Sequence, residues 1–228
     1  MGLIDQIASI PLFQGLPRKQ YEDLSMIVVD QVFRRGQPIF SEGDEGNGFY
    51  AVISGRVKIF KLSPEGKEQI LHIFGPGEPF GEAAVFAGKE FPANAEALEE
   101  SRVFFFPRQA FMELVGKNPT LALNMMAVLS TRLRRLTNLV EDLSLKEVPG
   151  RLAAYLLLLS EKNKKAVKVE LEISKNQLAS LLGTIPETLS RILTRMTREK
   201  LIKTDGKKID IVNRKALEEL ASGESRLS

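Results

Sequence analysis

The sequence predicts an α+β protein in which a β-rich N-terminal region, one long helix and a mainly helical C-terminal domain follow one another. Three observations predict this class. Between Val32 and Pro107, short runs of alternating apolar and polar residues are separated by glycines. From Pro119 to Leu145, apolar residues recur at alternating spacings of four and three. From Ser174 to Lys200, two short helical patterns flank a tight turn.

Composition and charge exclude several classes of protein. The chain has no cysteine and one histidine, which excludes disulfides, zinc ribbons, cysteine-ligated iron–sulfur clusters and multi-histidine metal sites. No nucleophile–base pair or metal constellation stands out, so we expect no enzyme. No apolar run is long enough to span a bilayer and no secretory signal begins the chain, so we expect a cytoplasmic protein. Residues 1–145 carry 15 Lys+Arg against 18 Asp+Glu, and residues 146–228 carry 17 against 11. The positive charge therefore lies in the C-terminal part, as phosphate binding requires.

The N-terminal region begins with helices and continues as strands. The segment from Leu3 to Val29 predicts short helices interrupted at Pro11 and Pro17. Many short strands with frequent turns then favour an antiparallel barrel or sandwich, which is a common place for a small-molecule pocket. The predicted strands are residues 38–40, 49–53, 57–61, 69–74 and 103–106.

The long helix carries the apolar repeat of a coiled coil over three heptads. A strict period of 3.5 residues favours a partner helix, and a twofold dimer is the simplest solution. The alternative is one amphipathic helix that packs on its own domain. The repeat consists of Ala122, Met126, Leu129, Leu133, Leu136, Val140 and Leu143.

The segment from Ser174 to Lys200 is typical of a helix-turn-helix. Ser174 and Gln177 have the spacing of a capping box, Gly183 suits a helix end, and Pro186 suits the first turn of the next helix. In the second helix, Leu189, Ile192, Leu193 and Met196 form the predicted buried side. Its other side presents Glu187, Thr188, Ser190, Arg191 and Arg195, as in a helix that enters a DNA major groove.

Two side chains of that helix have the chemistry of base readers. Arg191 can donate to O6 and N7 of guanine, and Glu187 can accept from N4 of cytosine. The alternative is a solvated ion pair between side chains four residues apart. The next segment favours DNA binding, because Asp205-Gly206 lies between two alternating runs and predicts a hairpin with basic residues, the wing of a winged helix.

The stretches GQPIFSEGDEGNGFYAVISGRVKIF and FGPGEPFGEAAVF resemble the cyclic-nucleotide-binding β-roll. Together with the winged helix, they make the chain resemble the CRP/FNR superfamily of bacterial transcription regulators. The resemblance implies a homodimer that binds palindromic DNA, acts on RNA polymerase and is controlled by an effector held in the β-roll. It also implies four parts: a β-roll over 1–118, a dimerisation helix over 119–145, a hinge over 146–149, and a winged helix-turn-helix over 150–228.

The resemblance breaks down at the effector. In cyclic-AMP-binding members, a Gly-Glu pair meets the ribose and an Arg-Ser pair holds the phosphate. Gly81 and Glu82 match the first pair, but Phe91 and Pro92 occupy the positions of the second. Without that pair an anionic phosphate loses charge-assisted contacts, so we expect an effector other than cyclic AMP. Lys89 is an alternative cation for the phosphate. The remaining pocket candidates are Asn94, Leu136 and Thr137.

The run Pro-Ala-Asn-Ala-Glu-Ala and the helix Pro-Glu-Thr-Leu-Ser-Arg resemble the nitrosative-stress branch of the family, some members of which bind haem. His72 is then the only possible histidine ligand, although one strand histidine is more often structural. The thioether candidates, which equally suit core packing, are Met26, Met112, Met125 and Met126.

The expected DNA contacts follow from the same resemblance. Glu187, Ser190 and Arg191 reproduce the E-x-x-S-R pattern of the FNR branch, whose half-sites contain a TTGA-like core. The expected phosphate contacts are Ser174, Lys175, Asn176, Lys207 and Lys208. An effector-gated regulator is thus the first hypothesis. The second is an effector-independent DNA-binding regulator whose β-roll serves as a structural and partner-contact platform.

Overall fold

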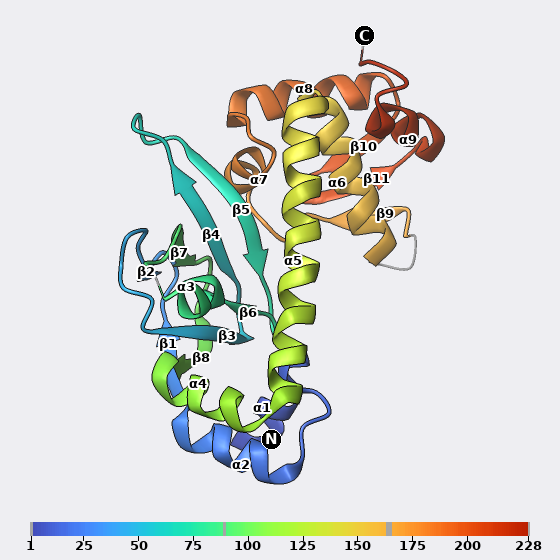
Figure 1. Ribbon diagram of the computed structural model, residues 1–228. Coiled ribbons are helices and arrows are strands. Elements are labelled where there is room, and N and C mark those ends of the chain that lie inside the picture. The colour runs from blue at the N-terminus through green and yellow to red at the C-terminus, as the bar shows by residue number, and fades with distance from the viewer. Residues whose placement is uncertain (1, 89, 163–165, 228) are drawn as a thin grey trace. The chain divides into compact units, whose positions relative to one another are not determined.

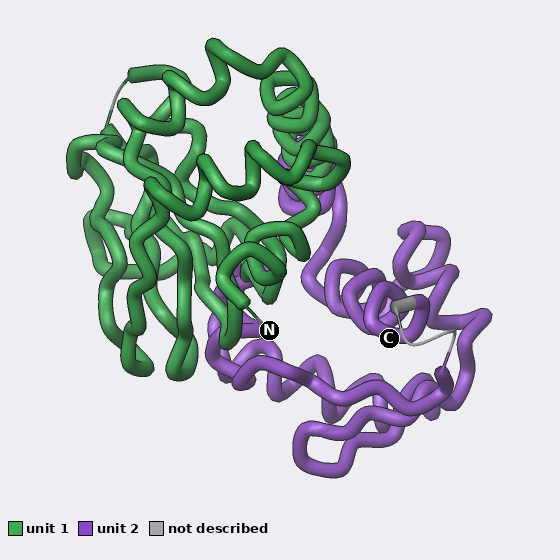
Figure 2. Tube along the Cα trace, turned by 90° about the horizontal axis from the view of Figure 1, so that it is seen from below, with its two compact units in different colours: residues 1–135 green, residues 136–228 purple. Residues whose placement is uncertain are grey.

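The computed structural model describes residues 2–88, 90–162 and 166–227. The chain divides into two compact units, residues 1–135 and 136–228, which Figure 2 distinguishes by colour. Among the described residues, no helix is both long enough and apolar enough to cross a membrane.

The first unit contains two four-stranded antiparallel sheets with helices packed against them (Figure 1). One sheet has the order β1-β8-β3-β6, formed by Val29–Phe33, Ser101–Pro107, Gly48–Ser54 and Pro79–Phe80. The other has the order β2-β7-β4-β5, formed by Pro38–Phe40, Asn94–Ala97, Val57–Leu62 and Glu68–Phe74. The helices are α1 (Leu3–Ala8), the 3₁₀ turn η1 (Pro11–Phe13), α2 (Arg18–Ile27), α3 (Glu82–Ala87) and α4 (Arg108–Lys117).

The aromatic residues of this unit form two cores. The helix-side core joins α1, η1, α2 and α4 to the first sheet through rings such as Phe13, Phe49, Phe106 and Phe111. The roll core lies between the sheets and contains Phe40, Tyr50, Phe74, Phe80 and Phe91. Burial of each large ring stabilises the fold by about 1.5–3 kcal/mol relative to an exposed ring.

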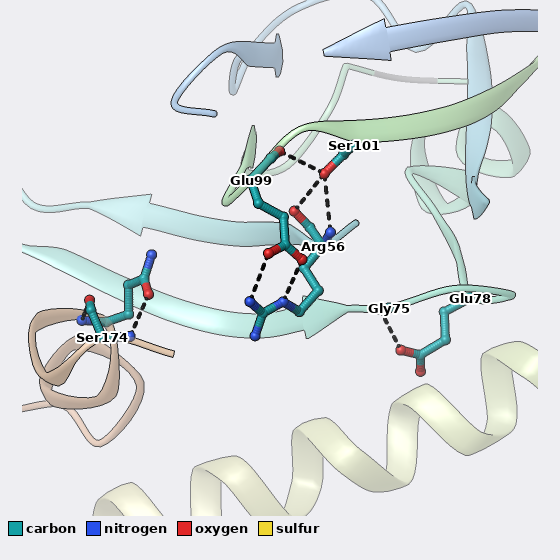
Figure 3. A network of polar contacts seen from close by, with 7 residues as sticks. Arg56, Gly75, Glu78, Glu99, Ser101 and Ser174 are labelled. Carbon is teal, nitrogen blue, oxygen red and sulfur yellow. Dashed lines mark hydrogen bonds and ion pairs between the residues drawn. The ribbon is translucent and has the colours of Figure 1, made fainter. Parts of the chain in front are cut away.

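Two of the connections that pass from one sheet to the other, β3–β4 and β7–β8, are bonded to each other (Figure 3). Arg56, between β3 and β4, donates to both carboxylate oxygens of Glu99 at 2.8 and 3.0 Å. The buried Ser101 hydroxyl accepts from the Arg56 N–H at 3.1 Å. At Gly55, where φ is +81°, a Cβ atom would lie 2.4 Å from Ser101 Oγ, so this turn requires glycine. The contacts fix how the two sheets close over the roll core.

One long helix, α5 (Pro119–Leu145), runs through the division between the units. The chain leaves helical geometry only at Lys146 and Glu147, before α6 (Val148–Lys162) begins. The break is shorter than the hinge expected over 146–149. Pro149 lies in the first turn of α6, where its missing N–H removes no hydrogen bond, so the proline begins a helix instead of interrupting one.

The second unit is a small helical domain with a three-stranded sheet of order β10-β11-β9. Its remaining elements are β9 (Lys168–Glu170), α7 (Lys175–Leu181), α8 (Pro186–Arg198), β10 (Ile202–Asp205), β11 (Lys208–Ile211) and α9 (Arg214–Ser222). Residue Asp205 pairs with Lys208 across the hairpin turn, as the Asp-Gly signal predicts.

The five predicted strands of the first unit are all present, but β1, β6 and β7 were missing from the prediction. The prediction also continued the N-terminal helices to Val29, whereas α2 ends at Ile27 and Val29 begins β1. Both β6 and β7 are short, and β7 contains two alanines that have low strand propensity. Pairing with β3 and with β2 and β4 fixes them, and such pairing leaves no local signal.

Candidate DNA-binding surface and effector region

Helices α7 and α8 form the predicted helix-turn-helix. The Ser174 hydroxyl accepts from the Gln177 N–H at 3.2 Å, and the Gln177 side chain accepts from the Ser174 N–H at 2.8 Å, so the capping box exists as predicted (Figure 3). The chain turns at Gly183 with φ +66°, and Pro186 is the first residue of α8. Local sequence signals therefore set the angle at which α8 leaves the turn.

Helix α8 separates its buried and exposed residues as predicted. The side chains of Leu189, Ile192, Leu193 and Met196 are buried. Glu187, Ser190 and Arg191 are exposed, and Thr188 is half-buried. A helix that is anchored on one face and polar on the other can enter a groove without loss of its core contacts.

The predicted phosphate contacts are solvent-exposed on two segments of the second unit. Ser174, Lys175 and Asn176 begin α7, and Lys207 and Lys208 lie at the turn between β10 and β11. Cationic and N–H donors of this kind orient a protein on a duplex without reading its sequence.

The predicted effector residues of the first unit lie in or beside the roll core. Glu82 is 2 % exposed and its carboxylate forms an ion pair with Arg132 of α5. The Arg132 guanidinium lies 4.8 Å from the centre of the Phe74 ring. Burial lowers the pKa of Arg132 to about 10, against the opposing effect of the Glu78 carboxylate, so the guanidinium stays charged at neutral pH. The second Glu82 oxygen, Oε2, has no hydrogen-bond partner among the described residues.

Phe91 fills part of the roll core. It is 2 % exposed and stacks on Phe40 with ring centres 3.8 Å apart. Gly81 has φ +80°, and a Cβ atom there would lie 3.1 Å from the Phe91 ring. The Gly-Glu pair and the aromatic residue in place of the arginine are therefore in close contact, and the aromatic ring offers an anion no charge partner.

The polar groups next to Phe91 already have hydrogen-bond partners within the protein. Lys61 donates to the Pro92 carbonyl at 3.0 Å and forms an ion pair with Glu42. Asn94 accepts from the Glu42 N–H at 3.0 Å. An open depression of about 920 Å³ adjoins them and is lined by Glu42, Glu45, Glu90 and Arg108, an acidic set that disfavours an anion.

Lys89, the alternative cation, lies outside the described residues. Leu136 and Thr137 are exposed on the part of α5 that belongs to the second unit.

The surroundings of His72 do not fit a haem ligand. Arg135 Nη1 lies 3.2 Å from His72 Nε2 and 3.1 Å from Glu78 Oε1. A guanidinium can only donate, so Nε2 accepts and is already bonded. Of the thioether candidates, Met125 is buried in the helix-side core, and Met26, Met112 and Met126 are exposed. The described residues also contain no group of three or more metal-ligating His, Cys, Asp or Glu side chains.

Glu78 completes this cluster from the turn before β6. Burial raises the pKa of Glu78, but its interactions with His72, with the Gly75 N–H and with Arg135 outweigh that effect and lower the pKa to about 2. Figure 3 shows the bond to Gly75, which measures 3.0 Å. Arg132 and Arg135 thus bond α5 to two carboxylates of the β-roll.

The apolar repeat of α5 is largely uncovered in the single chain. Leu133 is 69 % exposed and Val140 is 63 % exposed, whereas Leu129 and Leu143 are half-buried. Met126 and Leu136 are also exposed. A row of exposed apolar side chains along one helix is typical of a surface that a second helix covers.

Two known domain families match the N-terminal and the C-terminal parts of the chain. Residues 30–118 match the cyclic nucleotide-binding domain, and residues 150–220 match the Crp-like helix-turn-helix domain. The chain is 31 % identical over 207 residues to a CRP-like cAMP-activated global transcriptional regulator of Mycobacterium tuberculosis, covering 89 % of this chain and 92 % of that one. It is 32 % identical over 192 residues to the fumarate and nitrate reduction regulatory protein of Escherichia coli, covering 82 % and 76 %.

Solved structures show the same arrangement of elements. FixK2 from Bradyrhizobium japonicum matches with a TM-score of 0.74 and 25 % identity, covering 85 % of this chain and 97 % of that one. TTHA1359 from Thermus thermophilus, a CRP/FNR-family transcriptional regulator, matches with a TM-score of 0.68 and 29 % identity, covering 87 % and 100 %. With a cyclic nucleotide-binding-type domain, a long helix and a helix-turn-helix in this order, the chain belongs to the CRP/FNR family of DNA-binding transcription regulators, which are not enzymes.

Proposed function

We propose that this chain is a homodimeric regulator that reads a palindromic DNA site with α8 and responds to an effector other than cyclic AMP. The single observation that carries DNA reading is the division of α8 into a fully anchored face and an exposed face with Glu187, Ser190 and Arg191. The proposed parts are the β-roll over 1–118, the dimerisation helix over 119–145 and the DNA-binding domain from residue 150. RNA polymerase is the further partner that the family resemblance implies.

The proposal of a homodimer is supported by the repeat on α5. A single helix would leave Leu133 and Val140 exposed to water, whereas two copies of α5 related by a twofold axis would bury both residues. The same twofold axis would present two copies of α8 to two half-sites of opposite direction, and a palindrome follows from that symmetry.

The proposal against cyclic AMP is supported by Phe91 and its surroundings. A cyclic phosphate needs a cation and a hydroxyl donor, and the corresponding positions hold a buried ring and a proline. Haem sensing of nitric oxide is not part of this proposal, because His72 Nε2 is bonded to Arg135. One observation favours the second candidate, an effector-independent regulator: the Phe40–Phe91 stack and the Glu82–Arg132 ion pair occupy the positions that correspond to the family's effector contacts.

DNA reading is tested by Arg191→Ala, with Arg198→Ala as the matched control from the exposed end of the same helix. We expect Arg191→Ala to weaken binding to the specific duplex by about 1–3 kcal/mol, and to leave binding to random DNA unchanged. Arg198→Ala should keep the preference for the specific duplex. If Arg191→Ala bound the specific duplex like wild type with only a smaller salt dependence, Arg191 would be a phosphate contact and the base-reading role would be wrong.

The effector is tested by calorimetric titration with cyclic AMP, with the cAMP-activated M. tuberculosis relative as the positive control. We expect heat of binding from the relative and none from this chain. Saturable binding of cyclic AMP here would contradict the proposed effector class. Operator binding that no small molecule changes would favour the effector-independent candidate.

A further inference from the structure

The residue immediately before α8 is an exposed isoleucine, Ile185. Ile185 is the N-cap of the helix, is 48 % exposed, and makes no side-chain capping hydrogen bond. The N-caps of α7 and α9 in this unit are different. Ser174 forms a full capping box, and the Asn213 side chain accepts from the Ala216 N–H at 3.1 Å at the start of α9.

Stability does not account for an isoleucine at this position. Serine, threonine, aspartate and asparagine stabilise an N-cap, whereas an aliphatic side chain leaves a first-turn N–H without a side-chain acceptor. Ile185 gains only part of the transfer free energy that a buried isoleucine would gain. Its backbone carbonyl accepts from the Leu189 N–H at 3.1 Å, but any residue type supplies that bond. A residue that breaks a local rule without a structural gain is expected where function requires it.

The chemistry of the neighbouring side chains shows what an isoleucine adds. Glu187 and Arg191 are exposed and suit the hydrogen-bonding edges of cytosine and guanine. Neither recognises thymine through its distinguishing group, the C5 methyl, which projects into the major groove and takes apolar contacts. Ile185 is the large apolar residue two positions before Glu187, and its β-branched side chain is stiff, so contact with a methyl group costs little conformational entropy.

We infer that Ile185 is a specificity-determining residue that contacts the C5 methyl of a thymine beside the base pairs read by Glu187 and Arg191. This inference rests on the proposed function, because it requires α8 to lie in the major groove. It adds a preference for thymine over cytosine and uracil that the polar side chains of α8 cannot supply.

The experiment uses the palindromic duplex that the full-length wild type selects from random DNA. Each thymine is replaced in turn by 2′-deoxyuridine, which removes the methyl and keeps every hydrogen-bonding group. We expect one thymine per half-site at which wild type loses about fourfold in affinity, the factor expected for burial of one methyl group. Ile185→Ser should bind the thymine and deoxyuridine duplexes equally at that position.

The same serine variant provides a second readout that separates recognition from folding. Serine is a favourable N-cap, so the thermal midpoint of Ile185→Ser should equal or exceed that of wild type while thymine discrimination disappears. Val212→Ser is the matched control, because Val212 is a 58 % exposed apolar residue of the same unit that follows β11. That variant should keep the full response to deoxyuridine.

The outcomes distinguish this inference from the proposed function. A deoxyuridine profile that is the same in wild type and Ile185→Ser, or that is flat in wild type, overturns the role of Ile185 while specific binding through Arg191 still stands. If wild type selects no palindrome, or Arg191→Ala selects the same one with equal affinity, the proposed function fails and the inference fails with it.

Discussion

Removal of the buried ion pair between Glu82 and Arg132 should destabilise the β-roll strongly. The Glu82 side chain is 3 % exposed, and its Oε2 atom has no hydrogen-bond partner among the described residues. In Arg132→Met the apolar stem remains against Phe74, but the carboxylate stays buried without a cation. We expect this to lower the free energy of unfolding by about 3–5 kcal/mol, the usual cost of breaking a buried pair from one side.

The double variant Arg132→Met/Glu82→Gln makes the test sharper. It buries no net charge, so its loss of stability should be clearly smaller than the sum of the two single losses. Native-state hydrogen exchange of the amides in β3 and β8 measures the opening of this unit alone, which matters in a chain with two compact units. If the loss of unfolding free energy in the double variant equalled the sum of the losses in the two single variants, the argument that the carboxylate depends on Arg132 would be refuted.

Three further predictions follow from the described geometry. Val140→Glu should dissociate the dimer in sedimentation, whereas the neighbouring exposed Asn138→Glu should not, because only Val140 belongs to the apolar repeat. The folded-state pKa of Glu78, about 2, lies below the ordinary value of 4.5, so its stabilisation is present above pH 4.5 and is lost as pH falls towards 2. Glu78→Gln should therefore flatten the acid-unfolding curve measured by circular dichroism over that range. Titration with haemin should give a spectrum equal to the sum of those of free haemin and the protein. A saturable Soret shift would contradict the interpretation that His72 is not a haem ligand.

The sequence predicted the DNA-binding domain better than the effector region, and the reason is physical. The capping box of Ser174 and Gln177, the turn at Gly183 and the Asp-Gly hairpin are local devices, since each depends on residues within four positions. The Glu82–Arg132 pair joins residues 50 positions apart, and the sequence around either residue contains no signal that predicts its partner. Topology brings them together. For the same reason, the sequence predicted that Phe91 stands in the place of a phosphate partner but did not predict that its ring stacks on Phe40.

The roll core bears directly on the choice between an effector-gated and an effector-independent regulator. Any ligand that enters it has to replace the Phe40–Phe91 stack and compete with Arg132 for Glu82, so its binding free energy is reduced by the cost of those contacts. Arg132 and Arg135 leave the same helix that carries the apolar repeat, and a ligand that displaced Arg132 would change how α5 is held. If the roll gates DNA binding, Arg132→Met should alter operator affinity even without a ligand, because a shift between two states requires only that one of them lose a contact. If the roll is a structural platform, the same variant should lose stability and keep the affinity of its folded fraction for the operator.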